Sequence, residues 1–111
     1  YNGGSQIFLL NNECYDNGDR GIVVHGNELP QNGGVLRGNN LHGNKDGIAF
    51  YLATGTRVVD NDIEENSDYG LRIAAQDLTI ERNRLTSNVK GNINENPQSL
   101  NITYQDNILV D

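Results

Sequence analysis

Apolar and polar positions alternate along this chain in a unit that recurs four times. Each unit has an Asn, an apolar residue two positions later, and a second Asn three positions after that. A Gly then follows, and in the first three units it has apolar residues at the first and third positions after it. The units begin at Asn12, Asn39, Asn61 and Asn83, which are 27, 22 and 22 residues apart. A repeat of this length with short strands between Gly and Asn residues is typical of a solenoid with one coil per repeat.

The third unit serves as a template for one coil. We expect strands over residues 57–60, 62–64 and 70–74, with turns at Asn61 and over residues 66–69. Because side chains along a strand alternate between its two faces, Leu71 and Ile73 should point inward. The predicted fold class is therefore all-β, a right-handed parallel β-helix of about four to five coils in a single domain over residues 1–111.

Apolar residues at equivalent positions of successive coils predict the rows of the core. The first strand of each coil contributes Leu9, Leu36, Val58 and Ile80. The second contributes Cys14, Leu41, Ile63 and Leu85, and the third contributes Ile22, Ile48 and Leu71 together with Val24, Phe50 and Ile73. Each row should stack along the axis of the solenoid, because a repeat can bury its apolar face only against its neighbours.

The repeated Asn residues are predicted to be structural. An Asn tolerates the left-handed backbone of a tight corner, and its amide can bond the Asn of the neighbouring coil. Identical side chains about 4.8 Å apart form such amide ladders. One ladder would contain Asn12, Asn39, Asn61 and Asn83, and the other Asn17, Asn44, Asn66 and Asn88.

The repeat is irregular in two places, and the register of its last stretch is ambiguous. Residues 25–34 lengthen the first coil and predict a loop that bulges from the end of its third strand. Residues 92–98 replace a clean third strand in the fourth coil, and residues 100–111 begin a fifth coil in which either Gln105 or Asn107 takes the ladder position. Both ends then expose strand edges, so we expect further coils of a longer helix or a stacking partner chain to cover them.

The net charge and the composition exclude some classes of binding partner. The net charge of −7 argues against nucleic acid, which requires clustered Lys and Arg. No apolar run is long enough for a membrane helix and no signal peptide is visible, so we expect no membrane partner. The chain opens at Tyr1 instead of Met, from which we expect that an upstream segment has been removed.

The repeat resembles that of pectin-lyase-like and related carbohydrate-acting β-helix proteins, over nearly the whole chain. The closest resemblance is to the catalytic module of secreted mannuronan C5-epimerases, in which a Gly-Ile-Val-Val strand precedes a long loop ending in Gly-Gly. Here those elements are residues 21–24 and Gly33-Gly34. The resemblance implies a secreted protein acting on acidic glycans such as alginate or pectin. The Asp-Pro-His-Glu motif that holds that family's catalytic Asp and His is absent from this sequence.

In these folds the sugar chain lies along an outer sheet face, which directs attention to outward residues of the third strands. The candidate catalytic residues are His25 and Tyr51, and the candidate substrate-binding residues are Arg20, Asp46, Tyr69 and Arg72. An Arg can pair with a uronate carboxylate and acidify the C5 proton, which a His or Tyr then removes or donates. The resemblance places His25 where the family has a catalytic Asp, and Asp46 where it has a His.

Three functional readings follow. The first is part of a secreted epimerase or lyase that works by C5 proton abstraction. The second is a non-catalytic structural or adhesive β-helix, such as a surface-protein or phage-tail segment, and the third is an inactive scaffold. The acidic corners also leave open a Ca²⁺ site, because Ca²⁺ takes several oxygen ligands from such loops. No zinc cluster or nucleotide-binding loop is visible in the sequence.

Overall fold

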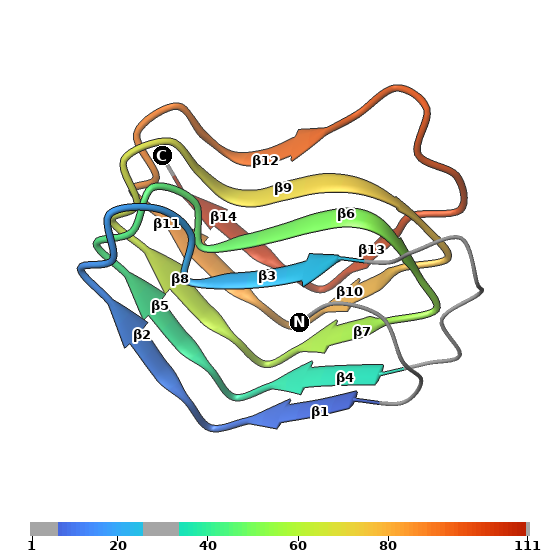
Figure 1. The fold of residues 1–111 in the computed structure, drawn as a ribbon, viewed down its shortest axis with the longest axis horizontal. Coiled ribbons are helices and arrows are strands. Elements are labelled where there is room, and N and C mark those ends of the chain that lie inside the picture. The colour runs from blue at the N-terminus through green and yellow to red at the C-terminus, as the bar shows by residue number, and fades with distance from the viewer. Residues whose placement is uncertain (1–6, 26–33, 111) are drawn as a thin grey trace.

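The computed structural model describes residues 7–25 and 34–110, which form an all-β solenoid (Figure 1). Each of the first four coils supplies one strand to each of three parallel sheets, and the last described coil supplies strands to the first two sheets. The first sheet contains β1 (Ile7–Leu10), β4 (Gly34–Arg37), β7 (Arg57–Val59), β10 (Thr79–Glu81) and β13 (Thr103–Gln105). The second contains β2 (Glu13–Tyr15), β5 (Asn40–His42), β8 (Asp62–Glu64), β11 (Arg84–Thr86) and β14 (Ile108–Val110).

The third sheet contains β3 (Ile22–His25), β6 (Ile48–Thr54), β9 (Tyr69–Gln76) and β12 (Gly91–Glu95). The predicted parallel β-helix is confirmed.

The described part of the chain contains no helix that is long and apolar enough to cross a membrane.

The predicted core rows are confirmed by the strand registers. Leu9, Leu36, Val58 and Ile80 are direct partners across the first sheet, and Cys14, Leu41, Ile63 and Leu85 across the second. Side chains in the middle coils are completely buried, including Leu41, Ile63 and Leu71. Since each coil contributes only a few inward side chains, the core is a thin column that gains its burial from the coils on either side.

Both Asn ladders form as predicted. Asn61 shows the pattern, because its Nδ2 donates to Oδ1 of Asn83 at 2.9 Å and to the carbonyl of Leu36 at 2.9 Å. Its own Oδ1 accepts from the backbone N–H and Nδ2 of Asn39. The first ladder continues to Asn107, which settles the alternative with Gln105.

The expectation that the ladder Asn residues adopt the left-handed backbone is wrong. The positive φ belongs to the residue just before each ladder Asn, for example Asp60 (φ 56°) before Asn61 and Glu65 (φ 57°) before Asn66. The predicted strand over 57–60 accordingly ends at Val59. The ladder Asn must present its amide to two neighbouring coils, so the turn is made one residue earlier, where the side chain points to solvent.

The third strands differ most from the prediction. Residues 91–95 form the strand β12, so the expectation that the fourth coil lacks a clean third strand is wrong. Strand β9 is longer than the predicted 70–74, and β6 carries a bulge at Leu52, which has φ 59°. Most of the predicted loop over 25–34 lies outside the described residues.

In the first three coils, the Gly at the start of the third strand is required by close packing against the next coil. A Cβ added to Gly47 would lie 2.5 Å from Cγ2 of Ile63 and 2.7 Å from the carbonyl oxygen of Gly70. One coil earlier, a Cβ on Gly21 would lie 2.8 Å from the carbonyl oxygen of Gly47. These glycines let the third sheet approach the Asn ladder closely. The close approach fixes the positions of the residues just before and after each Gly along the solenoid axis.

Candidate functional site

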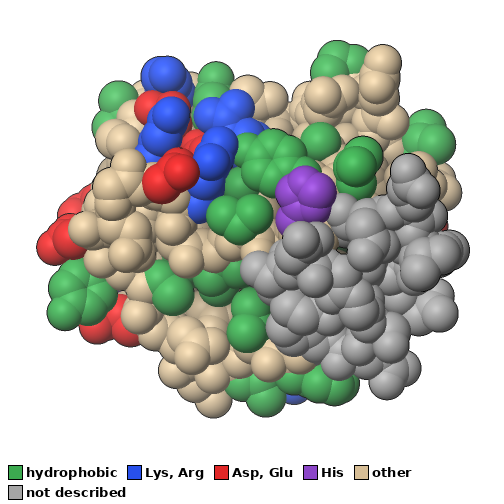
Figure 2. All heavy atoms as spheres, viewed as in Figure 1, with side chains coloured by type: hydrophobic (Ala, Val, Ile, Leu, Met, Phe, Trp, Pro, Cys, Tyr) green, Lys and Arg blue, Asp and Glu red, His purple; other side chains and the backbone are tan. Residues whose placement is uncertain are grey.

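Outward residues of the third sheet form two rows across the coils. One row contains Val23, Ala49, Arg72 and Asn94, and the other contains His25, Tyr51 and Ala74. The residues just before each third strand form a rim beside them, with Arg20 in the first coil and Asp46 in the second. Figure 2 shows Lys and Arg side chains gathered with acidic side chains on this face of the molecule.

Asp46 is the centre of the site. Its side chain has no exposed surface, and its Oδ1 accepts the backbone N–H of Tyr69 at 3.1 Å. Arg72 Nε donates to Oδ2 at 2.9 Å, and Arg20 Nε lies 3.6 Å from the same oxygen. A carboxylate removed from water costs free energy unless it is paired and hydrogen-bonded, and here the hydrogen bonds come from Arg72 and the Tyr69 backbone, with the Arg20 guanidinium close by.

Arg20 links the rim to the row of His25, Tyr51 and Ala74, which we call the aromatic row. Its Nη2 donates to the phenol oxygen of Tyr51 at 2.9 Å, and its guanidinium carbon lies 5.6 Å from the centre of that ring. Its Nη1 pairs with the exposed carboxylate of Asp19 at 3.1 Å. The buried Nε has no hydrogen-bond partner within the described residues, because Asp46 lies slightly too far away. Arg20 is therefore held mainly through its two outer nitrogens.

Arg72 lies on β9 between an aromatic ring and two carboxylates. Its guanidinium carbon is 5.0 Å from the centre of the Tyr69 ring, and Nη2 lies 3.7 Å from Oδ2 of Asp68. The hydrogen bond to Asp46 raises the pKa of the Arg72 guanidinium above its ordinary value. The group remains charged and is held in one orientation, with 30% of its side chain exposed.

Two charged residues extend the cluster beyond the six candidates. Lys90 Nζ lies 3.4 Å from Asp68 Oδ2, and the Asp68 side chain is only 13% exposed. Asp68 is not among the candidate residues predicted from the sequence. Its position one residue before Tyr69, at the same rim as Asp46, was the signal that would have revealed it.

His25 lies at the other side of Tyr51. The two rings are 6.2 Å apart with their planes inclined by 39°, and His25 is exposed. The neighbouring bulge carries Leu52, whose side chain is 66% exposed. The structure thus brings all six sequence candidates into one cluster, with polar side chains at the rim and an aromatic and apolar area next to them.

The described part of the chain contains no preformed metal-binding site. Over residues 7–25 and 34–110, no group of three or more His, Cys, Asp or Glu side chains is arranged to hold a metal ion. The carboxylates of the cluster instead face guanidinium and ammonium groups. What the cluster can do chemically is hold an anionic group with positioned Arg side chains and bring a phenol and an imidazole close to it.

Comparisons with known proteins bear on the fold. No curated protein and no solved structure matches this chain. A family model described as "Right handed beta helix region" matches residues 1–111. The chain therefore belongs to the right-handed β-helix family.

Proposed function

We propose that this chain is part of a secreted protein that acts on acidic polysaccharides such as alginate or pectin. In this proposal Arg72, within the cluster of candidate residues, holds a uronate carboxylate. The observation that carries the proposal is the buried carboxylate of Asp46, which hydrogen-bonds the Arg72 guanidinium at the surface of the third sheet and lies 3.6 Å from Arg20 Nε. Purely structural coils have no need to bury a charge beneath an outward-facing face, because burial is costly unless the charge is paired.

Arg72 has a side-chain N–H donor that is available to bind a uronate carboxylate. Within the described residues its Nη1 makes no hydrogen bond, whereas Nε and Nη2 face Asp46 and Asp68. A guanidinium held in place by its inner nitrogens loses little conformational entropy when its outer edge binds a carboxylate. Asp46 has no exposed surface, so in this proposal it positions the Arg side chains and does not touch the sugar.

The aromatic row supplies the chemistry if the protein is catalytic. Pairing of the uronate carboxylate with Arg72 stabilises the negative charge that develops when the C5 proton is removed. One of His25 and Tyr51 takes that proton, and donation of a proton to the opposite face of C5 by the other gives the C5 epimer. Loss of the C4 oxygen substituent from the same carbanion instead gives the unsaturated product of a lyase. Arg20 holds the Tyr51 phenol oxygen in place for either course.

The proposal is tested by titrating the chain with polymannuronate, polygalacturonate and a neutral mannan of equal length. Saturable NMR shifts at Tyr51, Tyr69, Arg72 and His25 with the acidic glycans, and none with the neutral one, are the expected result. Equal shifts with the neutral glycan would contradict a role for the carboxylate. No shift at millimolar sugar would favour the structural or adhesive β-helix.

A further inference from the structure

Leu52 combines a left-handed backbone with an exposed apolar side chain. Ten of the described residues other than Gly have a positive φ, and among them Leu52 alone is apolar and alone lies inside a strand. This backbone conformation is unfavourable for a residue with a Cβ, and Asn and Asp tolerate it better than Leu does. The Leu52 side chain is 66% exposed, so packing within the described chain does little to offset the strain. Strain at an exposed apolar residue suggests a contact with a ligand.

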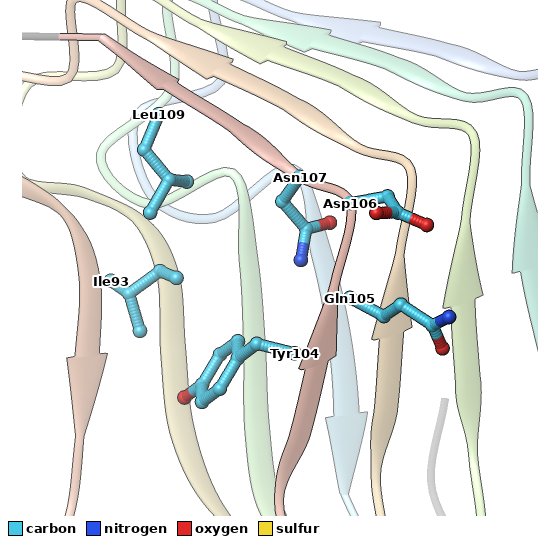
Figure 3. Close-up of a pocket in the computed structure, with 6 residues that line it drawn as sticks. All are labelled: Ile93, Tyr104, Gln105, Asp106, Asn107 and Leu109. Carbon is cyan, nitrogen blue, oxygen red and sulfur yellow. The ribbon is translucent and has the colours of Figure 1, made fainter.

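The exposure of Leu52 does not result from a position at the end of the solenoid. Strand β6 lies between β3 and β9, so it is paired on both sides within the third sheet. Tyr104 and Leu109 differ in this respect, because they continue inward rows of the core and are exposed in the last described coil (Figure 3). Leu52 instead lies on the outer face of the sheet that carries the candidate site.

The bulge in β6 places Leu52 next to Tyr51 on this outer face. Tyr51 pairs with Ala74 of β9 and Ala53 pairs with Ala75, which leaves Leu52 as the extra residue. Ala53 is buried, whereas Tyr51 is half-buried and Leu52 is exposed, so two consecutive side chains face outward instead of one. Ala74, the in-register neighbour of Tyr51, has a short side chain. Leu52, Ala74 and the Tyr51 ring together form what we call the apolar shelf.

The apolar shelf adjoins the charged cluster along the direction of the strands. Ala49 is the in-register partner of Arg72, and Leu52 follows Ala49 by three residues, which is roughly 10 Å along the strand. Beyond Leu52, the paired residues Thr54 and Gln76 are uncharged. Figure 2 shows hydrophobic side chains beside the Lys and Arg side chains on this face. A chain of acidic sugars has the same two parts, since each pyranose ring carries a carboxylate and also presents apolar C–H groups.

We propose that Leu52 is a specificity-determining residue that packs against the C–H face of a sugar ring near the uronate bound by Arg72. This inference rests on the proposed function, because it assigns the carboxylate of the same glycan to Arg72. A separation of roughly 10 Å is longer than one pyranose ring, so the two contacts involve different sugars of one chain. Removing the Leu52 side chain from water then adds affinity for an oligomer and none for a single uronate.

The variant Leu52→Asn tests this contact. Asn is similar in size to Leu and tolerates the left-handed backbone, so the variant should unfold at a urea concentration no lower than that of wild type. Titration calorimetry should show about fivefold weaker binding of an oligouronate that is long enough to span both positions. NMR titration with the uronate monosaccharide should give equal affinities for the two proteins. Leu10→Asn, at a 49% exposed position on the first sheet, is the control and should bind the oligouronate as wild type does.

The measurements distinguish failure of this inference from failure of the proposed function. Equal binding of the oligouronate by wild type and Leu52→Asn would overturn the inference and leave the proposed function intact. An equal loss of affinity for the monosaccharide would also overturn it, because Leu52 would then act at the same sugar as Arg72. A lower urea midpoint for Leu52→Asn would show a structural role for Leu52 instead. If wild type binds no uronate of any length, both the proposed function and the inference are wrong.

Discussion

Arg72 Nε lies 2.9 Å from Oδ2 of Asp46, and that carboxylate has no exposed surface. The pair joins strand β9 to the segment just before β6, one coil away. Because the carboxylate also accepts the backbone N–H of Tyr69, it sets both the position of β9 and the direction of the guanidinium. The candidate site is therefore part of the fold at its base and open to solvent at its outer edge.

Replacing Asp46 should disturb this arrangement more than replacing an exposed acid. Asp46→Asn keeps an acceptor for Tyr69 but leaves Arg72 and Arg20 without their shared counter-charge. We expect a loss of about 2 kcal/mol in the free energy of unfolding, below the usual cost of breaking a fully buried pair because both Arg side chains are partly exposed. Urea unfolding measures it. Asp62→Asn, whose side chain is 42% exposed, is the control, and equal losses would show that Asp46 has no special role.

The ladder should be more sensitive than the residues beside it. Asn61→Ala removes side-chain bonds to Asn83 and Leu36 and leaves buried partners unsatisfied, which we expect to cost about 3 kcal/mol. Asp62→Ala should change the free energy of unfolding by less than about 1 kcal/mol. Thermal unfolding of the two variants side by side measures the difference. Similar values for both would contradict the coil register described above.

A charge on the inner face of the third sheet should abolish folding. Leu71 is 0% exposed, and Leu71→Asp would bury an unpaired carboxylate whose cost exceeds most of the stability of a small domain. Ala74→Asp, on the outer face of the same strand, should remain folded. Circular dichroism spectra of the two variants check the assignment of inside and outside. A folded Leu71→Asp would contradict it.

The end of the core should respond to alkaline pH through Tyr104. Burial raises the pKa of its phenol, and its hydrogen bond to Glu95 raises it further. In the unfolded chain Tyr loses its proton at about pH 10. Because the pKa of Tyr104 is raised in the native state, above that pH the native state binds more protons than the unfolded state. The stabilisation is therefore present below pH 10 and is lost as pH rises. We expect the stability difference between wild type and Tyr104→Phe to shrink above pH 10, and a pH-independent difference would contradict this.

The repeat in the sequence was enough to predict the coils, the core rows and both ladders. Each of these depends on identical residues at a fixed period, as with Leu41 above Ile63 or Asn39 above Asn61. The six candidate site residues could be placed together for the same reason. In a solenoid, equal positions in successive coils become neighbours in space.

Features that occur only once could not be predicted in this way. The second ladder ends when Asn88 donates to Asn92, four residues further along, and no period signals that contact. The bulge at Leu52 interrupts the register of β6 without a Gly or Asn to mark it. The left-handed positions before the ladder are occupied by residues as different as Asp60, Arg82 and Ser87, because their side chains face solvent and leave no common pattern.

Binding of an oligouronate to Arg72→Ala is the decisive test of a carboxylate site on the third sheet, with Arg84→Ala as the matched control. Arg84 is an exposed Arg on the second sheet and also pairs with two carboxylates, at 3.6 Å and 3.8 Å. With both variants folded, titration calorimetry should show at least about tenfold weaker binding for Arg72→Ala, or about 1.4 kcal/mol, and unchanged binding for Arg84→Ala. Equal affinity of wild type and Arg72→Ala would contradict a carboxylate site on the third sheet.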